Sequence, residues 1–447
     1  MLMLLSLAFR NLIQARRRTT LLSIAVGVVT ALLVLLLAIG QGIEYNLIQS
    51  ATALTTGHFN VFGWYKPSSS DAAPIVEDAA AVRKLVEEST PDLDYTLVRH
   101  RGWGKLVSDT KSIQSSLQGI DIQAEPKFVA AFQLAPQKDY KDGGSDEVKG
   151  DLNKLSQPHS IALFASQAKR LEVDVGDVVT IQTETSGGRT NTLDVTVVAI
   201  GKDLGLLSGF VAVLPTSDIL TLYQLKDDTT GAIMVYVKDI DQSEAAMTKV
   251  RQALLDHGYK LMDYEPKPFF MKFESVMGEE WTGQKLDLSL WNDEVVFLTS
   301  AVTLFNGITW FLSLVLGGIV GLGIMNTMWN AVRERTREIG MMRAVGMTRG
   351  RVLVMILLEA LLLGLFATTA GALTGALLAW GIDAAGIHLP WAAVRAILLS
   401  ENLTLAVSPL SLVAAVVALS ALTAAGALLP AWRASRLRPI TAIQSVE

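Results

Sequence analysis

The chain has no cysteine, and this absence removes several kinds of chemistry at once. Disulfides, a lipid-bearing cysteine and zinc–thiolate sites are excluded, so a folded domain must be held together by its hydrophobic core. The phosphate-binding pattern G-x-x-x-x-G-K-[ST], the G-x-S-x-G turn and the H-E-x-x-H helix are missing too. The five histidines stand singly. We therefore expect no catalytic residue, metal site or cofactor in this chain, and we do not expect an enzyme.

Charged residues are scarce as well. They make up 18% of the 447 residues, against 50% hydrophobic residues, and this balance is too apolar for a soluble chain of this length. A hydrocarbon core of ~30 Å needs about 20 helical residues, and four uncharged runs are each long enough to cross it once. The predicted fold class is an α-helical membrane protein with four transmembrane helices and a large external α/β domain. The transmembrane helices are expected at 19–43, 295–332, 352–382 and 402–432.

The first apolar run resembles a signal peptide in its position but not in its details. Its apolar core is too long, and no small-residue cleavage site follows it. We therefore expect an uncleaved anchor. The segment before it, 1–18, is apolar on one side and basic on the other, which is typical of a helix lying in the cytoplasmic membrane interface. A plain positive anchor for the first span explains its arginines equally well.

Lysine is absent outside 44–294, and arginines flank the spans. Because basic residues of short flanking segments stay on the cytoplasmic side, the N-terminal segment, 333–351 and the tail 433–447 are predicted to be cytoplasmic. The block 44–294 and a short loop, 383–401, are then external. Long domains are translocated largely regardless of charge, so the lysines do not contradict this orientation. We expect a multi-pass protein of the inner (cytoplasmic) membrane with both termini cytoplasmic and the large domain periplasmic.

The external block has a mixed α/β pattern. Two segments, 57–115 and 230–266, each read as a β-α-β unit, and the second ends on "YKLMDY" as its last strand. Between them, 116–229 is rich in strands. We predict a β-rich part inserted between two β-α-β halves. The net charge of −5 averages over two compartments and indicates no particular partner, and nothing points to nucleic acid.

The second span is unusually long. Its 38 uncharged residues would reach ~57 Å as a helix, against a core of ~30 Å. We expect the excess to project outward as a stalk, continued upstream through the apolar residues between Trp281 and Trp291. The first span is expected to continue outward through "IEYNLIQSATAL" in the same way.

Two features within the spans are candidate functional groups. Glu359 is the one carboxylate inside a span and costs ~3 kcal/mol near the bilayer centre. It lies two helical turns from Arg351, and we favour an interfacial acid that pairs with that arginine or caps a neighbouring helix over a transport role. Two small-xxx-small pairs allow helices to approach closely, and bundle packing is favoured over a dimer contact. These helix-packing glycines are Gly317, Gly321, Gly371 and Gly375.

The segment between the second and third spans is far more charged than an anchoring loop requires. It carries six arginines and two glutamates over 332–351, with apolar residues among them. Gly346 is a helix-stop signal. This pattern predicts a short helix that docks on a partner, with Glu338 and Arg343 pairing with polar groups there. Apolar anchors are expected to enter a groove on that partner, and they are Ile339, Met342 and Val345. The alternative is a loop that only fixes the topology.

At these residues the sequence resembles the MacB/LolE-type permeases of ABC transporters, also called the FtsX-like family. That family carries V-x-E-R-T-x-E-I-G-x-x-R-A-x-G-A-x-x after its second span, and this chain departs only at Met347, where alanine is usual. "LQGIDIQAE", "LEVDVGDVVTI" and "PAWRASRLRPITAI" extend the resemblance along the chain. The matching residues are Val332, Glu334, Arg335, Thr336, Glu338, Ile339, Gly340, Arg343, Ala344 and Gly346.

The resemblance implies a coupling helix that docks on a separate ATPase subunit, which binds the ATP and Mg. It also implies two permease chains, identical or homologous, with two ATPases, in contact with membrane lipid and with a periplasmic partner. The external domain is expected to be a porter-like part with an inserted sabre-like part. The residues implied in ATPase coupling are Arg333, Glu334, Arg335, Thr336, Arg337, Glu338, Ile339, Met342, Arg343, Ala344, Val345 and Gly346.

The resemblance further implies mechanotransmission, in which ATP-driven closure moves the external domains rather than opening a channel. A substrate already outside, such as a lipoprotein, would be extracted or handed on. Because no ATPase sequence precedes the first span, the lipoprotein-releasing type is the expected subtype. Regulation of cell-wall hydrolases remains the alternative within the family, and a membrane-bound sensor is the alternative outside it.

Overall fold

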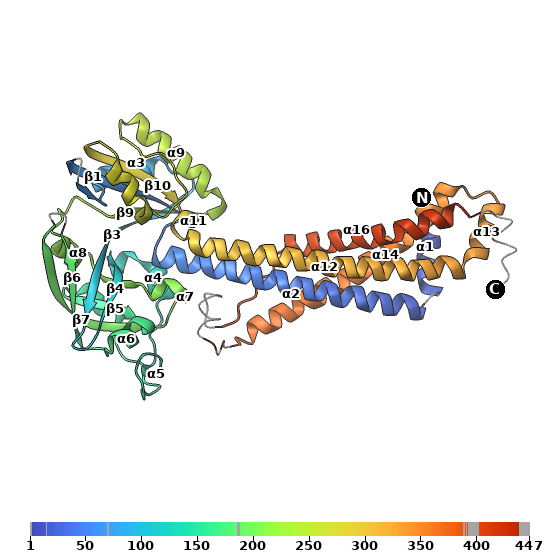
Figure 1. Ribbon diagram of the computed structural model, residues 1–447, viewed down its shortest axis with the longest axis horizontal. Helices are drawn as coiled ribbons and strands as arrows, with labels where there is room; N and C mark the ends of the chain where they lie inside the picture. Colours follow the sequence, from blue (N-terminus) through green and yellow to red (C-terminus); the bar gives the residue numbers. More distant parts are fainter. Residues whose placement is uncertain are drawn as a thin grey trace. The chain divides into compact units, whose positions relative to one another are not determined.

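The computed structural model divides the chain into a helical unit and an α/β unit (Figure 1). The helical unit comprises Met1–Tyr45, Ala301–His388 and Asn402–Glu447, and the α/β unit comprises Asn46–Ser300 and Leu389–Glu401. The structure describes residues 2–14, 16–68, 71–185, 188–387, 389, 391 and 402–437. Most of the predicted external loop 383–401, and the tail beyond 437, therefore lie outside the described residues.

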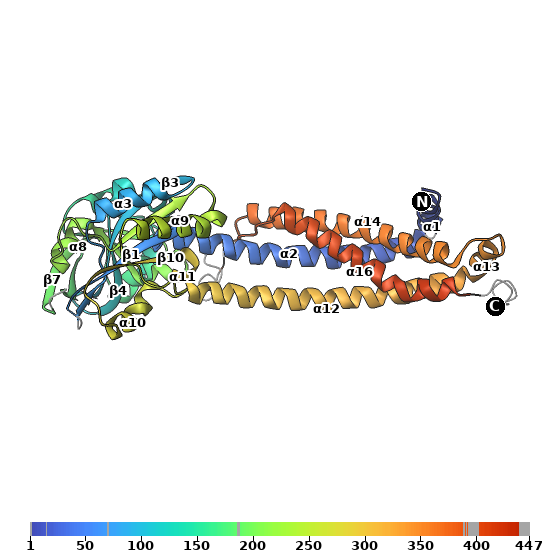
Figure 2. The same cartoon turned by 90° about the horizontal axis from the view of Figure 1, so that it is seen from above.

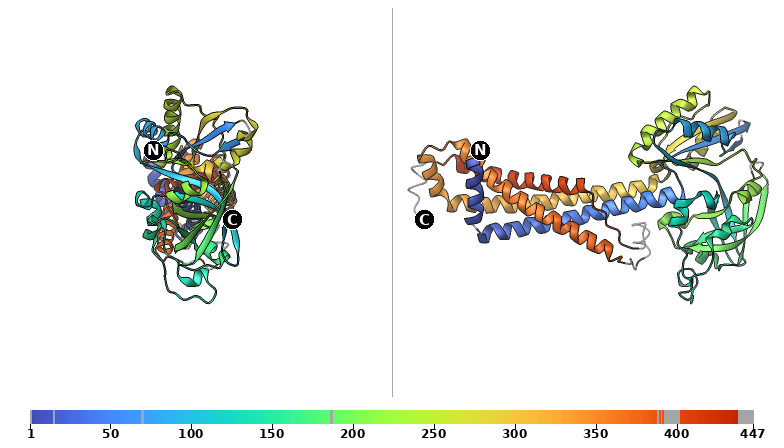
Figure 3. Two further views of the ribbon diagram at one scale, coloured as in Figure 1. Left: turned by 90° about the vertical axis from the view of Figure 1, so that its left-hand side faces the viewer. Right: turned by 180° about the vertical axis from the view of Figure 1, so that it is seen from behind.

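Long apolar helices make up the helical unit. They run alongside one another, and α1 crosses them at one end (Figures 2 and 3). Its helices are α1 (Leu2–Gln14), α2 (Arg16–Leu54), α12 (Val296–Glu334), α13 (Thr336–Ala344), α14 (Arg349–Ala384) and α16 (Pro409–Ser435). Within the described residues, four of these are long and apolar enough to cross a membrane, namely α2, α12, α14 and α16. The four transmembrane helices of the predicted fold class are therefore confirmed.

The fourth span begins later than predicted. Residues 402–408 are not helical, and α16 starts at Pro409. Proline fixes a helical φ but cannot donate to the preceding turn, so it suits the first position of a helix. The apolar stretch before it packs against other helices instead. The backbone N–H of Leu405 donates to Asp383 at 3.0 Å, and that of Ala406 donates to the carbonyl of Ala38 at 3.1 Å.

Small residues set how closely the helices of this unit approach. A Cβ at Gly371 of α14 would lie 2.3 Å from the carbonyl oxygen of Gly27, and one at Gly375 would lie 2.8 Å from that of Ala31. Both partners are on α2. On α12, a Cβ at Gly317 would meet the side chain of Leu422 at 2.8 Å. The carbonyl oxygen of Gly321 approaches the same helix, since a Cβ at Gly426 would lie 2.8 Å from it, but a Cβ at Gly321 itself would meet nothing within 4 Å. Three of the four predicted packing glycines, Gly317, Gly371 and Gly375, thus lie where a side chain would clash at a crossing inside this chain.

The α/β unit is built on one continuous sheet. Within the described residues it has ten strands in the order β10-β1-β9-β3-β4-β8-β5-β7-β6, with β2 beside β1. The strands are β1 (Phe59–Ser68), β2 (Asp71–Ala73), β3 (Leu93–Val107), β4 (Ser112–Ile120), β5 (Ser160–Phe164), β6 (Val178–Glu184), β7 (Thr190–Gly201), β8 (Val211–Pro215), β9 (Ala232–Val237) and β10 (Gly283–Leu290).

Two lobes share this sheet. We call β1, β2, β9, β10 and the first half of β3 the first lobe, and the second half of β3 with β4 to β8 the second lobe (Figure 1). Helices of the first lobe are α3 (Ala79–Ser89), α9 (Ser243–Asp256), η3 (Ile240–Gln242), η4 (Phe269–Lys272), α10 (Phe273–Gly278) and α11 (Trp291–Glu294). Helices of the second lobe are η1 (Ile122–Ala124), α4 (Pro126–Ala131), α5 (Gln137–Tyr140), η2 (Leu152–Ser156), α6 (Ala165–Leu171), α7 (Gly205–Ser208) and α8 (Thr216–Tyr223).

The boundary between the lobes differs from the prediction. The inserted part was expected to begin at 116, but β3 already changes partner at about residue 100. Its residues 93–99 pair with β9, and 100–107 pair with β4. One strand of 15 residues serves both lobes, so no break in the sequence marks the change.

The stalk prediction was wrong for the residues before α12. Leu286, Leu288 and Leu290 lie in β10, which pairs antiparallel with β1. Their spacing of two places all three on one face of a strand, whereas a helix would distribute them around its axis. The last strand of this part of the sheet is β10, and not "YKLMDY" as predicted. That segment forms only an isolated β-bridge, between Leu261 and Leu286. α2, by contrast, does continue unbroken to Leu54.

Candidate functional site

The charged segment between α12 and α14 forms a short helix with breaks on both sides. α13 has nine residues. Arg335 leaves helical geometry between α12 and α13, with φ −101° and ψ 14°. After α13, Gly346 has φ +107°, a conformation that favours glycine, and the N–H of Met347 donates back to the carbonyl of Met342 at 3.0 Å. The predicted helix stop at Gly346 is therefore where the chain turns.

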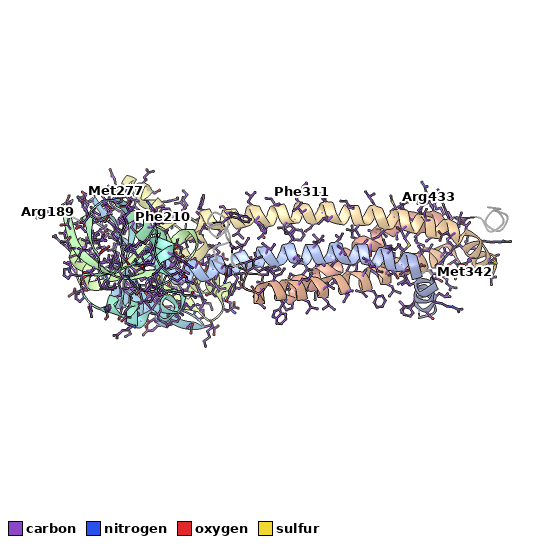
Figure 4. The ribbon with its side chains drawn as sticks, turned by 90° about the horizontal axis from the view of Figure 1, so that it is seen from below. Arg189, Phe210, Met277, Phe311, Met342 and Arg433 are labelled. Atoms are coloured by element: carbon purple, nitrogen blue, oxygen red, sulfur yellow. The ribbon has the colours of Figure 1, made fainter. Side chains whose placement is uncertain are left out.

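The inner face of α13 is buried in this chain's own core. Ile339 is 4% exposed and belongs to a cluster with Val352, Met355 and Ile356 of α14, and with the end of α16. Met342 packs against the same cluster. Figure 4 labels Met342 at this end of the helical unit. The expectation that Ile339 enters a partner's groove is therefore wrong, because α14 and α16 already cover it, whereas Met342 is only half-buried and its prediction stays open.

The outer face of α13 carries exposed charged and apolar side chains. Val345 is 90% exposed and Met341 is 50% exposed. Arg337 and Glu338 are exposed beside them. Positions 337, 341 and 344 recur at helical spacing on one side of α13, and Val345 follows directly at its end. Of the three predicted apolar anchors, only Val345 is exposed, and Met341 is exposed beside it.

Arg335 connects three helices beneath α13. Its Nη1 lies 3.3 Å from Glu359 of α14, and its Nη2 donates to the carbonyl of Asn11 of α1 at 3.2 Å. The side-chain amide of Asn11 also donates to Glu359, at 3.4 Å. The predicted partner of Glu359, Arg351, is exposed and lies about 12 Å away along the helix axis. The expected interfacial ion pair thus exists, but with Arg335.

The far end of α13 is tied to the end of α16. The guanidinium of Arg343 donates to the backbone carbonyl of Leu437. Arg433, labelled in Figure 4, stacks over the ring of Trp329 with its Cζ 4.8 Å from the ring centroid. Arg343 is therefore used inside the chain rather than presented to a partner. Cation–ring contacts of this kind are worth about 0.5–1 kcal/mol at exposed sites.

The predicted coupling residues fall into two groups. The first group supports α13 from within the chain, and it includes Arg335, Thr336, Ile339, Met342 and Arg343. The second group is exposed, and it consists of Arg333, Glu334, Arg337, Glu338, Ala344, Val345 and Gly346. Sequence reasoning missed Asn11 as a supporting residue. No local signal marks it, because Arg10 and Gln14 are equally polar neighbours in the same segment.

Comparisons with known families agree with this architecture. The family model described as the MacB-like periplasmic core domain matches residues 19–253, which is more than half of the chain. The model described as FtsX-like permease C-terminal matches residues 310–439, which include α13 and its supporting helices. Within the described residues, no group of three or more histidine, aspartate or glutamate side chains could hold a metal ion.

Relatives align over much of the chain at low identity. The macrolide export ATP-binding/permease protein MacB of Brucella melitensis is 27% identical, over 80% of this chain and 49% of that protein. An uncharacterized ABC transporter permease of Methanocaldococcus jannaschii is 24% identical, over 65% of this chain and 68% of its own length. Several MacB proteins match over most of this chain. The chain spans about half of the length of these relatives.

Among solved structures, the periplasmic region of MacB from Actinobacillus actinomycetemcomitans matches with a TM-score of 0.30 and 14% identity. That match covers 55% of this chain and 94% of the solved one. The two family models account between them for α2, most of the α/β unit and the helices around α13. The chain therefore belongs to the MacB/FtsX-like family of ABC transporter permeases.

Proposed function

We propose that this permease couples ATP hydrolysis in a separate ATPase subunit, which binds the ATP and Mg, to movement of its external domain. The observation that carries the proposal is the geometry of α13. Its inner face is fixed to α14 and α16, and its outer face presents Met341 and Val345 beside exposed charges. A rigidly supported helix with exposed apolar anchors suits docking into a groove.

The end of α2 supports the mechanical part of the proposal. Arg99 of β3 is buried and donates to the carbonyls of Leu54 and Ala53, at 2.6 and 2.8 Å. Its guanidinium is held in turn by Glu125, with both contacts at 2.6 Å. These carbonyls are the last of α2 and have no partner within the helix. A displacement of this helix end would therefore be passed to β3, which belongs to both lobes.

We further propose that the substrate is a molecule of the cell envelope that is extracted or moved outside the membrane, with a lipoprotein as the favoured case. The MacB relatives are named as macrolide export proteins, whereas the resemblance to the lipoprotein-releasing type supports a lipid-modified substrate. A second permease chain is expected beside this one. Exposed apolar residues along α12, such as Phe311 (labelled in Figure 4) and Leu314, suit contact with lipid or with that second chain.

The docking proposal is tested with the variant Val345→Asp. Because Val345 is 90% exposed, an aspartate there leaves this chain's core intact but places a charge in the partner's groove. Loss of a buried apolar anchor costs ~2 kcal/mol or more, so we expect co-purification of the ATPase to fall by roughly 30-fold. Met341→Asp should reduce co-purification of the ATPase in the same way. ATP hydrolysis by the complex is measured in parallel, and the isolated chain is expected to show none.

Val148→Asp is the matched control, because this valine is 53% exposed and belongs to the α/β unit rather than to α13. It should leave ATPase recruitment unchanged. Wild-type recruitment and full ATP hydrolysis with Val345→Asp and Met341→Asp would show that α13 is not the docking element.

A further inference from the structure

A groove lies between α12 and α16 at the charged end of the helical unit. Its volume is about 200 Å³. Positions 329, 332, 333 and 336 line one side of it, and positions 430, 433, 434 and 437 line the other. Both sets follow the i, i+3, i+4, i+7 spacing of a single helix face, so each helix turns one face to the groove.

The groove opens where α12 and α16 move apart. The two helices cross closely at small residues, since a Cβ at Gly426 would lie 2.8 Å from the carbonyl oxygen of Gly321. Two turns further along each helix stand Trp329 and Arg433, which is labelled in Figure 4. The Cζ of Arg433 lies 4.8 Å from the centroid of the Trp329 ring. These large side chains hold the groove open towards the ends of the helices.

Two arginines line this groove, and no carboxylate of the described residues lines it. The arginines are Arg333 and Arg433, one from each helix. Glu334 follows Arg333 in the sequence, but it lines a different cavity together with Arg335 and Glu359. Among the residues that the structure describes, neither Arg333 nor Arg433 has an ion-pair partner, whereas Arg335 pairs with Glu359 at 3.3 Å. The groove therefore carries two positive charges with no negative charge in its walls.

The stacking of Arg433 prepares it to bind an oxyanion. The ring of Trp329 contacts the flat face of the guanidinium, and the N–H groups point outward in the plane of that face. A guanidinium can donate two parallel hydrogen bonds to a phosphate group, and stacking holds it in one orientation. Arg436 stacks on Trp432 in the same way, with its Cζ 3.9 Å from the ring centroid.

The position of the groove selects a lipid phosphate over a soluble one. Both α12 and α16 are long and apolar enough to cross a membrane, so their ends lie at the level of the phospholipid headgroups. Tryptophan beside arginine is typical of this level. Towards the middle of the spans, both helices expose apolar side chains, with Leu322 63% and Leu429 48% exposed. Basic pockets between membrane helices suit anionic headgroups.

We propose that this groove binds an anionic phospholipid, with its phosphate oxygens accepting hydrogen bonds from Arg333 and Arg433 and its acyl chains lying along α12 and α16. A lipid bound in this way bridges the two helix ends beside α13. The proposal goes beyond the coupling function, and binding needs no ATPase. Its failure is therefore distinguishable from failure of the coupling proposal.

The test compares phosphatidylglycerol with phosphatidylcholine of the same acyl chains. The full chain is purified in mild detergent, freed of lipid and titrated with each lipid, and bound lipid is counted by native mass spectrometry. Both lipids carry a phosphodiester, but choline brings its own positive charge into the groove. We expect phosphatidylglycerol to bind about tenfold more tightly, the effect of one hydrogen bond between charged groups.

Variants separate a built site from general attraction to positive charge. Arg333→Gln and Arg433→Gln should each weaken binding of phosphatidylglycerol by about tenfold. Arg433→Lys keeps the charge but loses the paired donors, so it should retain only part of the affinity. Arg351→Gln is the matched control, because it removes the same charge from an exposed arginine of α14 that does not line the groove. Folding of each variant is checked by its thermal unfolding curve.

Four outcomes would overturn the proposal. Equal affinities of the wild type for the two lipids would show that the groove does not select a negative headgroup. Equal losses with Arg351→Gln and Arg433→Gln would assign binding to the overall charge of this end. Displacement of phosphatidylglycerol by an equal concentration of inorganic phosphate would assign the arginines to a soluble anion. Unchanged lipid binding but lost co-purification of the ATPase with Arg333→Gln and Arg433→Gln would assign the groove to the ATPase.

Discussion

At the scale of single residues, buried ion pairs join segments that are far apart in the sequence. Lys272 and Asp287 are 2% and 0% exposed in their side chains, and Nζ contacts both carboxylate oxygens at 2.8 and 3.0 Å. This pair fixes η4 to β10. Such pairs add little over an apolar pair of similar size, but loss of one partner leaves an uncompensated buried charge.

Lys272→Met should therefore destabilise the α/β unit. Removal of one partner from a buried pair costs about 3–5 kcal/mol, so we expect a clear drop in the midpoint of unfolding. The measurement is denaturant unfolding followed by fluorescence. Lys138→Met removes a pair in which both side chains are exposed, and it should change the midpoint little. A stability of Lys272→Met equal to that of the wild type would contradict the role given to this pair.

His58 gives the α/β unit a dependence on pH. Burial, together with the charge of Lys127, lowers its pKa from 6.5 to about 4, and the N–H of Val237 donates to its Nδ1 at 3.2 Å. The folded state therefore holds the neutral ring, while the unfolded chain takes up a proton below about pH 6.5. Stability is unaffected above that pH and is lost progressively as the pH falls from 6.5 towards 4.

The variant His58→Gln removes this titration, so its melting temperature should fall less than that of the wild type between pH 7 and pH 5. Thermal unfolding at half-unit pH steps measures the difference. His257→Gln alters an exposed histidine at the end of α9 and should keep the wild-type profile. Identical profiles for His58→Gln and the wild type would remove His58 as the cause.

At the scale of elements, close helix crossings define the helical unit. The contact of α14 with α2 depends on glycines whose backbones touch, since a Cβ at Gly371 would lie 2.3 Å from a backbone oxygen. In lipid, helices associate through such close packing rather than through the hydrophobic effect. The same helix carries Gly381, where a Cβ would meet nothing within 4 Å.

Gly371→Ala should separate α14 from α2 and lower the melting temperature in detergent, because backbone atoms cannot give way as a flexible side chain can. Overpacking of this kind typically costs about 1–3 kcal/mol. Gly381→Ala should be neutral or slightly stabilising, because alanine favours the helix by about 1 kcal/mol over glycine. Equal melting temperatures for the two variants would argue against a close crossing at Gly371.

At the scale of the whole molecule, arginines gather around α13 and the ends of the neighbouring helices, and every lysine lies in 44–294. This distribution predicts that α13 is cytoplasmic and that the α/β unit is on the opposite side of the membrane. The absence of cysteine makes the prediction easy to test, since any introduced thiol is the only one.

Single cysteines at Ser217 and Thr348 are suitable reporters, because both positions are exposed. With an impermeant maleimide and an intact cytoplasmic membrane, Ser217→Cys should be labelled and Thr348→Cys should not. Lysis should then expose Thr348→Cys to the reagent, which controls for its reactivity. Labelling of Thr348→Cys before lysis would overturn the orientation.

The sequence by itself determined the features that depend on local composition and spacing. Four apolar runs are enough to predict four membrane helices, and the charged segment with Gly346 is enough to predict a short helix with a stop. The mixed α/β character of 44–294 follows from alternating periodicities in the same way. The family resemblance, carried by a local motif around Glu338, is confirmed by the family models.

Only the tertiary structure decided which residues meet. That Glu359 pairs with Arg335, that Ile339 faces inward while Val345 faces outward, and that β3 serves both lobes all depend on packing between segments distant in the chain. An apolar side chain on a short helix suits a partner's groove and the chain's own core equally well, and nothing in its local sequence distinguishes the two. The choice is made by the neighbouring helices that cover one face of α13 and leave the other open.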